Sequence, residues 1–102
     1  MAVVIITEPE GVTPDIYDAV NEKLDVSGGP PDGLKVHTAG VDDDGTFRVV
    51  DVWESREQHD RFRDERLVPA IMEVAKERGL PDPSGPPNNN VYEAHDVMIA
   101  PQ

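Results

Sequence analysis

Residues 34–54 have the sequence LKVHTAGVDDDGTFRVVDVWE, and this stretch decides the fold. Two runs rich in β-branched and aromatic residues, 34–41 and 47–54, flank the acidic segment 42–46. An Asp-Gly pair between such runs is a strong signal for a β-hairpin, because both residue types tolerate a positive φ angle. The stretch therefore predicts two adjacent antiparallel strands.

The register of this hairpin determines which side chains face each other across it. A loop of three or five residues centred on Asp44 places His37 directly opposite Asp51. A two-residue turn at Asp44-Gly45 instead places His37 opposite Val52. The residues leave both registers open.

The residues before the hairpin predict a strand and a helix. Residues 2–7 (AVVIIT) form a short, continuous apolar run, which is typical of a strand buried on both faces in the middle of a sheet. Thr13, Pro14 and Asp15 supply a capping hydroxyl, a proline for the first helical turn and an acid near the positive end of the helix dipole. The turn-forming segment 27–33 ends this helix. Its apolar stripe consists of Ile16, Val20 and Leu24.

The residues after the hairpin predict a second helix and a last strand. Ser55 is placed to cap this helix, with Gln58 completing a capping box. Pro69 removes one internal hydrogen bond, which predicts a kink or two shorter helices. Residues 80–90 (LPDPSGPPNNN) form a proline- and asparagine-rich connection, and residues 91–100 are the predicted last strand.

The predicted order of elements is β-α-β-β-α-β, the ferredoxin-like arrangement, with the first and third strands central in a four-stranded antiparallel sheet. We expect one α+β domain over residues 1–102. Hydrophobic residues make up only 37% of the chain, and one Trp, two Tyr and two Phe leave little bulk for a large interior. A chain this lean is expected to complete the burial of its apolar surface in a homodimer.

Charge and composition exclude several classes of function. Twenty-one acidic residues against nine basic ones give a formal charge of −12, which repels phosphate backbones and anionic lipids. We therefore expect neither a nucleic-acid nor a membrane partner. The chain has no cysteine, hence no disulfide, thiolate metal site or cysteine nucleophile. The N-terminal run lacks a basic region and is too short for a signal peptide or membrane span, so we expect a cytoplasmic protein.

Three segments resemble small bacterial proteins of the dimeric α/β-barrel superfamily, near the antibiotic-biosynthesis-monooxygenase-like members. They are residues 33–40 (GLKVHTAG), 47–55 (FRVVDVWES) and the pattern within 62–70, and the strand-to-helix junction at 53–55 is the most specific part. The resemblance implies two ferredoxin-like sheets that face each other across a dimer and enclose a cleft for an apolar or aromatic ligand. Members of the superfamily include cofactor-free monooxygenases, polyketide cyclases, haem-degrading enzymes and proteins with no known activity. The resemblance thus supports fold and dimer better than chemistry.

The haem-degrading branch of this superfamily can be tested against the sequence. Those relatives use an asparagine on the first strand, a tryptophan on the third and a histidine on the second helix. Trp53 matches the tryptophan, but residues 2–7 contain no asparagine. The expected helix position near 64–66 holds no histidine, and His59 lies about one turn too early. The comparison disfavours haem degradation, and we expect no cofactor.

His37 and Asp51 are the candidate catalytic pair. Cofactor-free oxygenation or cyclisation requires a base, a water-poor cavity and donors for an oxyanion, and polar strand residues that point into the barrel are expected to supply them. Asp51 lies in the apolar run VVDVW, where an acid must be hydrogen-bonded, paired or raised in pKa. His37 held by Asp51 is a plausible base; the alternatives are a buried structural pair or an edge histidine facing water.

Four further residues are candidate ligand contacts, each with a structural alternative. Trp53 is expected in the core or in the cavity wall, and the hydroxyl of Tyr17 reaches a cavity or is simply half buried. Alternation with a period of two places Arg48 on the opposite face of its strand from Asp51. His95, in the predicted last strand, contacts a ligand or is a solvated or interface histidine.

No metal site is predicted, because no histidines and acids in the sequence have the local spacing of metal ligands. The acidic turn 42–45 (DDDG) lacks both the first ligand and the flanking helices of an EF-hand.

Two classes of function remain. The leading hypothesis is a small-molecule protein of the dimeric-barrel type, a cofactor-independent monooxygenase acting on an aromatic or polyketide-like substrate. A polyketide cyclase-type lyase would use the same residues as acid and base. The alternative is a non-catalytic binding or interaction dimer whose cleft is filled by side chains. An open pocket containing His37 or Asp51 favours the enzyme, and an interior too small for a bicyclic ligand favours the binding protein.

Overall fold

The computed structural model describes residues 2–24, 29–80 and 88–100. The strands form one antiparallel sheet in the order β2-β3-β1-β4. This confirms the predicted α+β, ferredoxin-like arrangement with the first and third strands central. The elements are β1 (Val3–Glu8), α1 (Pro14–Leu24), β2 (Leu34–Val41), β3 (Phe47–Trp53), α2 (Arg56–Phe62), the π-helical turn η1 (Arg63–Leu67), α3 (Val68–Arg78) and β4 (Asn88–Glu93).

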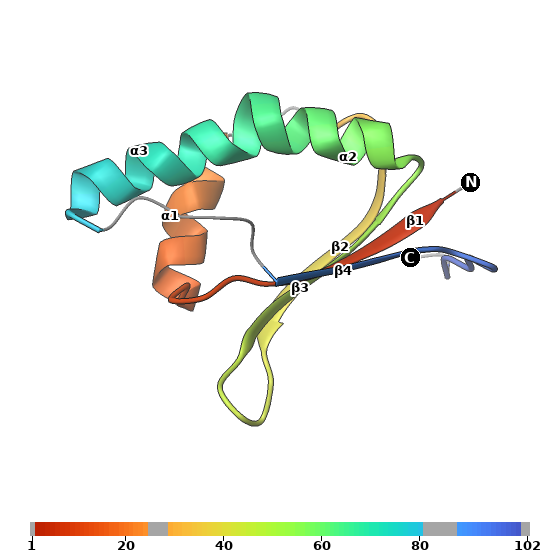
Figure 1. Cartoon of the computed structure of the whole chain (residues 1–102), viewed down its shortest axis with the longest axis horizontal. Helices are drawn as coiled ribbons and strands as arrows, with labels where there is room; N and C mark the ends of the chain where they lie inside the picture. Colours follow the sequence, from red (N-terminus) through yellow and green to blue (C-terminus); the bar gives the residue numbers. More distant parts are fainter. Residues whose placement is uncertain (1, 25–28, 81–87, 101–102) are drawn as a thin grey trace.

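The helical segments all lie on one side of the sheet, and none of the described helices covers the other side (Figure 1). Strand β1 reflects this arrangement. Val3 and Ile5 face the helix layer and are buried, whereas Val4 and Ile6, which alternate with them, remain half-buried. The prediction that this strand is buried on both faces is therefore wrong for the single chain, because only one layer of helices covers the sheet.

The buried apolar side chains form two clusters. One joins α1 to α3 around Val74, and the other joins β1 to β3 around Trp53. Trp53 is only 1% exposed. Phe62 packs against both clusters. The side chain of Phe62 therefore connects the helix–helix core to the core between helices and sheet.

The hairpin between β2 and β3 has a loop of three residues, 43–45. The N–H of Asp42 donates to the carbonyl of Thr46 (3.0 Å), and the N–H of Gly45 donates to the carbonyl of Asp42 (3.0 Å). Gly45 has a φ angle of +88°, which glycine adopts without strain. In the resulting register His37 is directly opposite Asp51, so one of the two registers left open by the sequence is now established.

The second predicted helix is interrupted, as expected from Pro69. A π-helical turn separates α2 from α3, and Pro69 lies in the first turn of α3, where its missing N–H is best tolerated. The three segments follow one continuous path over the sheet (Figure 1). The N-terminal cap of α2 is also confirmed, because the Ser55 hydroxyl accepts from the Gln58 N–H (3.2 Å) and donates to the Gln58 amide oxygen (2.9 Å).

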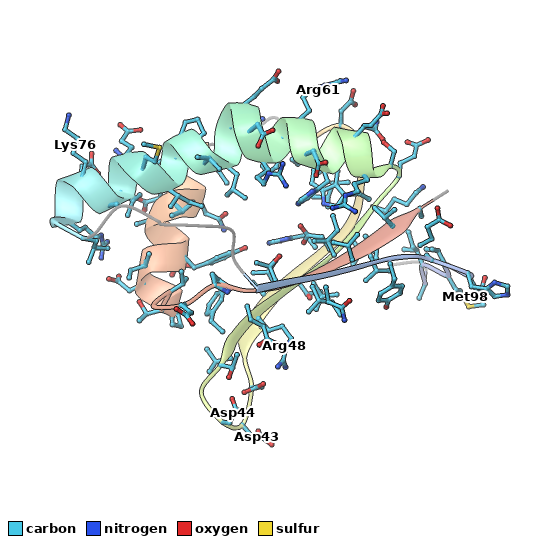
Figure 2. The ribbon with its side chains drawn as sticks, viewed as in Figure 1. Asp43, Asp44, Arg48, Arg61, Lys76 and Met98 are labelled. Atoms are coloured by element: carbon cyan, nitrogen blue, oxygen red, sulfur yellow. The ribbon has the colours of Figure 1, made fainter. Side chains whose placement is uncertain are left out.

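The last strand differs from the prediction of 91–100. Strand β4 spans Asn88–Glu93, and its pairing with β1 ends where Val3 meets Glu93. Beyond Glu93, residues 97–99 are exposed, and Met98 lies far from the helix layer (Figure 2). The alternating apolar pattern of residues 97–99 was misleading, because alternation does not record where the partner strand stops, and the pairing of β4 with β1 ends at Val3 and Glu93. Residues 81–87 of the predicted connection 80–90 lie outside the described residues, as do residues 25–28.

Membrane insertion finds no support in the helices that the structure describes, since none is both long and apolar enough to cross a bilayer.

Candidate functional site

A chain of four polar side chains links α1 to the helix-facing side of the sheet. Nδ1 of His37 lies 2.6 Å from Oδ1 of Asp51, and Nε2 of His37 lies 2.5 Å from the Tyr17 hydroxyl. The other carboxylate oxygen of Asp51 accepts from the indole N–H of Trp53 at 3.3 Å. The three elements α1, β2 and β3 thus bring together residues that are up to 36 positions apart in the sequence.

Strand pairing and helix packing explain this convergence. Directly paired residues of antiparallel strands point to the same face, so the pairing of His37 with Asp51 places their side chains in contact. Tyr17 reaches them from α1. The Tyr17 ring lies parallel to the His37 imidazole, with centroids 6.2 Å apart, and is tilted against Phe47 at 5.3 Å. These contacts tie α1 to the sheet beside its edge strand.

The environment of the pair favours a defined protonation state. The Asp51 side chain is 17% exposed and that of His37 is 39% exposed. An ionised carboxylate only accepts hydrogen bonds, so Nδ1 of neutral His37 carries the proton and Nε2 is left to accept from the Tyr17 hydroxyl. The hydrogen bond to Asp51 raises the pKa of His37 above its ordinary value; partial burial opposes this rise, and the carboxylate charge adds to it.

The orientation of the pair corrects one expectation. His37 and Asp51 do not point toward a barrel interior formed by two sheets; they share the face of Trp53, which is covered by helices. Alternation along β3 requires this, because a large indole at Trp53 can be buried only on the helix side. The uncovered face carries half-buried Val50 and Val52 instead. The candidate site therefore lies between the sheet and the helices.

Arg48 is not brought to this site. Its guanidinium lies 3.1 Å from a Glu8 carboxylate oxygen and 2.8 Å from an Asp42 oxygen, both close to the hairpin loop. Figure 2 shows Arg48 on the side of the sheet away from the helices. The predicted alternation is confirmed, and it separates Arg48 from the catalytic candidates.

His95 lies beyond the end of β4, in a bend, and is exposed. The prediction that it belongs to the last strand is wrong, for the same reason that this strand is shorter than predicted. No hydrogen bond or ion pair found among the described residues joins His95 to the group around His37.

His59 is a neighbour of the site that sequence reasoning did not assign to it. Its side chain is 11% exposed, and its ring meets the Trp53 indole edge-on with centroids 5.6 Å apart. Nδ1 of His59 lies 3.0 Å from the Asp60 carboxylate. The available signal was helical spacing, since His59 is three residues before Phe62, which packs on the same indole.

Two cavities can be described, and neither His37 nor Asp51 lines them. One, of about 310 Å³, lies between the loop after β1 and the end of the hairpin, and Phe47 forms part of its wall. The other, of about 230 Å³, lies where the end of α1 meets η1 and α3, beside Arg66. Across residues 2–24, 29–80 and 88–100, no three histidine or acidic side chains gather closely enough to hold a metal ion.

The sheet order and the single helix layer define a ferredoxin-like α+β fold, and solved structures named as antibiotic biosynthesis monooxygenases share it, as the sequence resemblance implied. No protein-family model and no curated protein matches the sequence. The likeness is to solved structures with low sequence identity.

Three such structures illustrate it. The cofactor-independent oxygenase SnoaB from Streptomyces nogalater, in a mutant form, has a TM-score of 0.55 and 14% identity over 95% of this chain and 94% of that chain. The monooxygenase ActVA-Orf6 from Streptomyces coelicolor, in complex with the ligand Nanaomycin D, has a TM-score of 0.52 and 21% identity over 98% and 92%. A protein of unknown function from Nitrosomonas europaea has a TM-score of 0.62 and 19% identity over 99% and 94%. These identities establish the fold alone.

Proposed function

We propose that this protein is a small-molecule enzyme of the cofactor-independent monooxygenase type, in which His37 and Asp51 provide the base that deprotonates an aromatic or polyketide-like substrate, either directly or through the Tyr17 hydroxyl bonded to His37. The observation that carries the proposal is the hydrogen-bonded chain from Tyr17 through His37 to Asp51. A general base needs a fixed orientation and a partner that stabilises its protonated form, and the carboxylate of Asp51 provides both. The fold shared with oxygenases is consistent with this assignment.

The chemistry can be written for anthrone, a neutral tricyclic probe with an acidic methylene group. The site removes one methylene proton, and the resulting carbanion reacts with O2. One oxygen atom becomes the new carbonyl of anthraquinone and the other leaves as water, so that anthrone and O2 give anthraquinone and H2O. The protein supplies only the base and its protonated form, while the substrate supplies the electrons. A formal charge of −12 favours such an uncharged substrate over an anion.

Two other functions use the same fold. A polyketide cyclase-type lyase would use the same pair as acid and base on a different substrate. A non-catalytic binding protein is favoured by one specific observation, namely that His37 and Asp51 line neither of the two cavities described above. Under that alternative the Tyr17–His37–Asp51 chain only fastens α1 to the sheet.

We further propose that the protein acts as a homodimer whose subunits meet through the uncovered face of the sheet. None of the described helices covers this face in the single chain, so its apolar side chains are available to a second copy. Half-buried apolar side chains of the two central strands lie on this face: Val4, Ile6, Val50 and Val52.

Anthrone oxidation in air-saturated buffer tests the enzyme proposal. We expect the wild-type protein to exceed the spontaneous rate, and His37→Ala and Asp51→Asn to lower the enzymatic rate by about 10²-fold or more, the usual contribution of a general base. Anthraquinone absorbance and O2 uptake provide the readouts. Asp43→Asn is a matched control, because it makes the same chemical change at the exposed tip of the hairpin (Figure 2).

Wild-type protein that binds anthraquinone without exceeding the spontaneous rate would favour the binding protein over the enzyme. Turnover that survives in both variants would rule out the His37–Asp51 pair as the base.

A further inference from the structure

Every hydrogen-bonding atom of the His37 ring already has a partner. Nδ1 faces Asp51 at 2.6 Å, and Nε2 faces the Tyr17 hydroxyl at 2.5 Å. A general base must present a lone pair within about 2.6–3.2 Å of the proton that it removes. With both nitrogens engaged, His37 has no lone pair to offer to a substrate while its hydrogen bonds to Asp51 and Tyr17 are intact.

The other two hydrogen-bonded side chains, Asp51 and Tyr17, can be compared as possible proton acceptors in the same way. Both carboxylate oxygens of Asp51 have donors, His37 on one and the Trp53 indole on the other, and this side chain is only 17% exposed. Tyr17 is half-buried, and its hydroxyl has two lone pairs in addition to the proton that it shares with His37. The Tyr17 oxygen is therefore the member of the chain that can accept a substrate proton.

We propose that Tyr17 is the group that takes the proton from the substrate. His37, held by Asp51, orients the Tyr17 hydroxyl and accepts the proton that this hydroxyl carried before. This inference rests on the proposed function. As the bond between the substrate and its proton breaks, that proton joins the Tyr17 oxygen, and the proton already on this oxygen moves to Nε2 of His37. The products are the substrate carbanion or enolate, a neutral Tyr17 and an imidazolium paired with Asp51. No oxidant or reductant is consumed in this step.

The surroundings of Tyr17 indicate which substrates suit it. Its ring packs on Phe47, with centroids 5.3 Å apart, and its hydroxyl meets the edge of the His37 imidazole, so a planar group approaching the hydroxyl meets aromatic surface. Among the ion pairs and hydrogen bonds of the described residues, none brings a lysine or arginine to Tyr17, His37 or Asp51. A substrate that arrives as an anion would find no compensating cation there. The site suits a neutral, planar carbon acid that becomes charged only on proton transfer.

Tyr17→Phe tests this inference, because it keeps the ring and its packing on Phe47 and removes only the hydroxyl. With anthrone as the probe, we expect kcat to fall about 10²-fold or more while KM changes less than about threefold. Adding Asp51→Asn to Tyr17→Phe should lower kcat little further, because residues that act as a unit are not additive. Tyr92→Phe is the matched control, since Tyr92 pairs with Val4 on the face of the sheet away from Tyr17 and is 51% exposed in the single chain.

The outcomes separate this inference from the proposed function. Active wild-type protein with an equally active Tyr17→Phe variant overturns the role of Tyr17 and leaves the His37–Asp51 base intact. A rise in KM together with a lower melting temperature, at unchanged kcat, identifies Tyr17 as a structural tether and also overturns the inference. Wild-type protein that does not exceed the spontaneous rate overturns the proposed function, and the inference with it.

Discussion

At the scale of single residues, Asp51 controls the protonation of His37. Its hydrogen bond raises the pKa of His37 in the folded protein above the value of about 6.5 expected in the unfolded chain. A raised pKa in the folded state contributes stability that is fully present below the unfolded pKa and is lost as the pH rises through the folded pKa. Because the His37 side chain is 39% exposed, solvent screens this contribution and keeps it small.

We therefore expect the stability advantage of wild-type protein over Asp51→Asn to shrink as the pH rises from about 6.5 through the folded pKa of His37. Urea unfolding at a series of pH values between about 6 and 8.5 measures the difference in free energy of unfolding. NMR of the imidazole gives the titration directly, and the His37 titration should move to lower pH in Asp51→Asn. The Asp43→Asn variant should leave it in place. A His37 titration that is identical in wild type and Asp51→Asn would contradict the assigned pairing.

The sequence identified His37 and Asp51 as candidate catalytic residues, but it did not predict that they contact each other. His37 faces Asp51 because the loop is centred on Asp44, whereas the Asp-Gly pair alone also suits a two-residue turn that would place His37 opposite Val52. The carboxylates of Asp42 and Asp44 help to hold the longer loop, since both accept from the N–H of Thr46, at 3.2 and 2.9 Å. The position of Tyr17 opposite His37 was out of reach, because packing of α1 on α3 sets it, and no local pattern in either segment records that packing.

At the scale of elements, Gly33 holds the start of β2 against the capped end of α2. Gly33 and Gly45 have nearly equal φ angles, +90° and +88°, so an alanine at either position suffers similar backbone strain. Only at Gly33 would the added Cβ meet another group, the amide of Gln58 at 2.6 Å. That amide accepts from the Ser55 hydroxyl in the cap of α2. Alanine at position 33 must therefore displace part of the cap as well as strain the backbone.

We expect Gly45→Ala to lower the free energy of unfolding by about 1 kcal/mol, and Gly33→Ala to lower it by about 1 kcal/mol more. Chemical denaturation of the two variants in parallel measures both values. Gln58→Ala provides the control, because its effect should overlap with that of Gly33→Ala when the two are combined. Equal losses for the two glycine variants would mean that Gln58 moves aside without cost.

Local and non-local signals explain which elements could be predicted. The caps at Thr13 and Ser55 place helix starts within a few residues of sequence, and the structure confirms both, with the Thr13 hydroxyl accepting from the N–H of Ile16 at 3.3 Å. The end of β4 depends on where the neighbouring strand stops, and among the described residues the last hydrogen bond between the two segments runs from the N–H of Ala94 to the carbonyl of Ala2. An alternating pattern in residues 97–99 carries no information about that limit.

At the scale of the whole molecule, the described helices leave one face of the sheet uncovered in the single chain (Figure 1). In a two-fold dimer through this face, each subunit would contribute the same residues to the interface, and the face of one subunit would pack against the same face of its partner. The formal charge of −12 on each subunit opposes such association at low ionic strength, so the apolar contact must outweigh a repulsion that salt screens. Dimerisation should therefore strengthen as the salt concentration rises.

Light scattering coupled to size-exclusion chromatography tests this arrangement. We expect a mass twice the 11.2 kDa of the chain, and we expect Val50→Lys to shift it toward the monomer, because the two-fold axis brings two buried ammonium groups into one interface. Val41→Lys makes the same change at a side chain that is 51% exposed near the hairpin loop and should leave the dimer intact. A wild-type monomer at every salt concentration would contradict the dimer but would leave the Tyr17–His37–Asp51 chain unaffected, since that chain lies within one subunit, on the helix-covered face of the sheet.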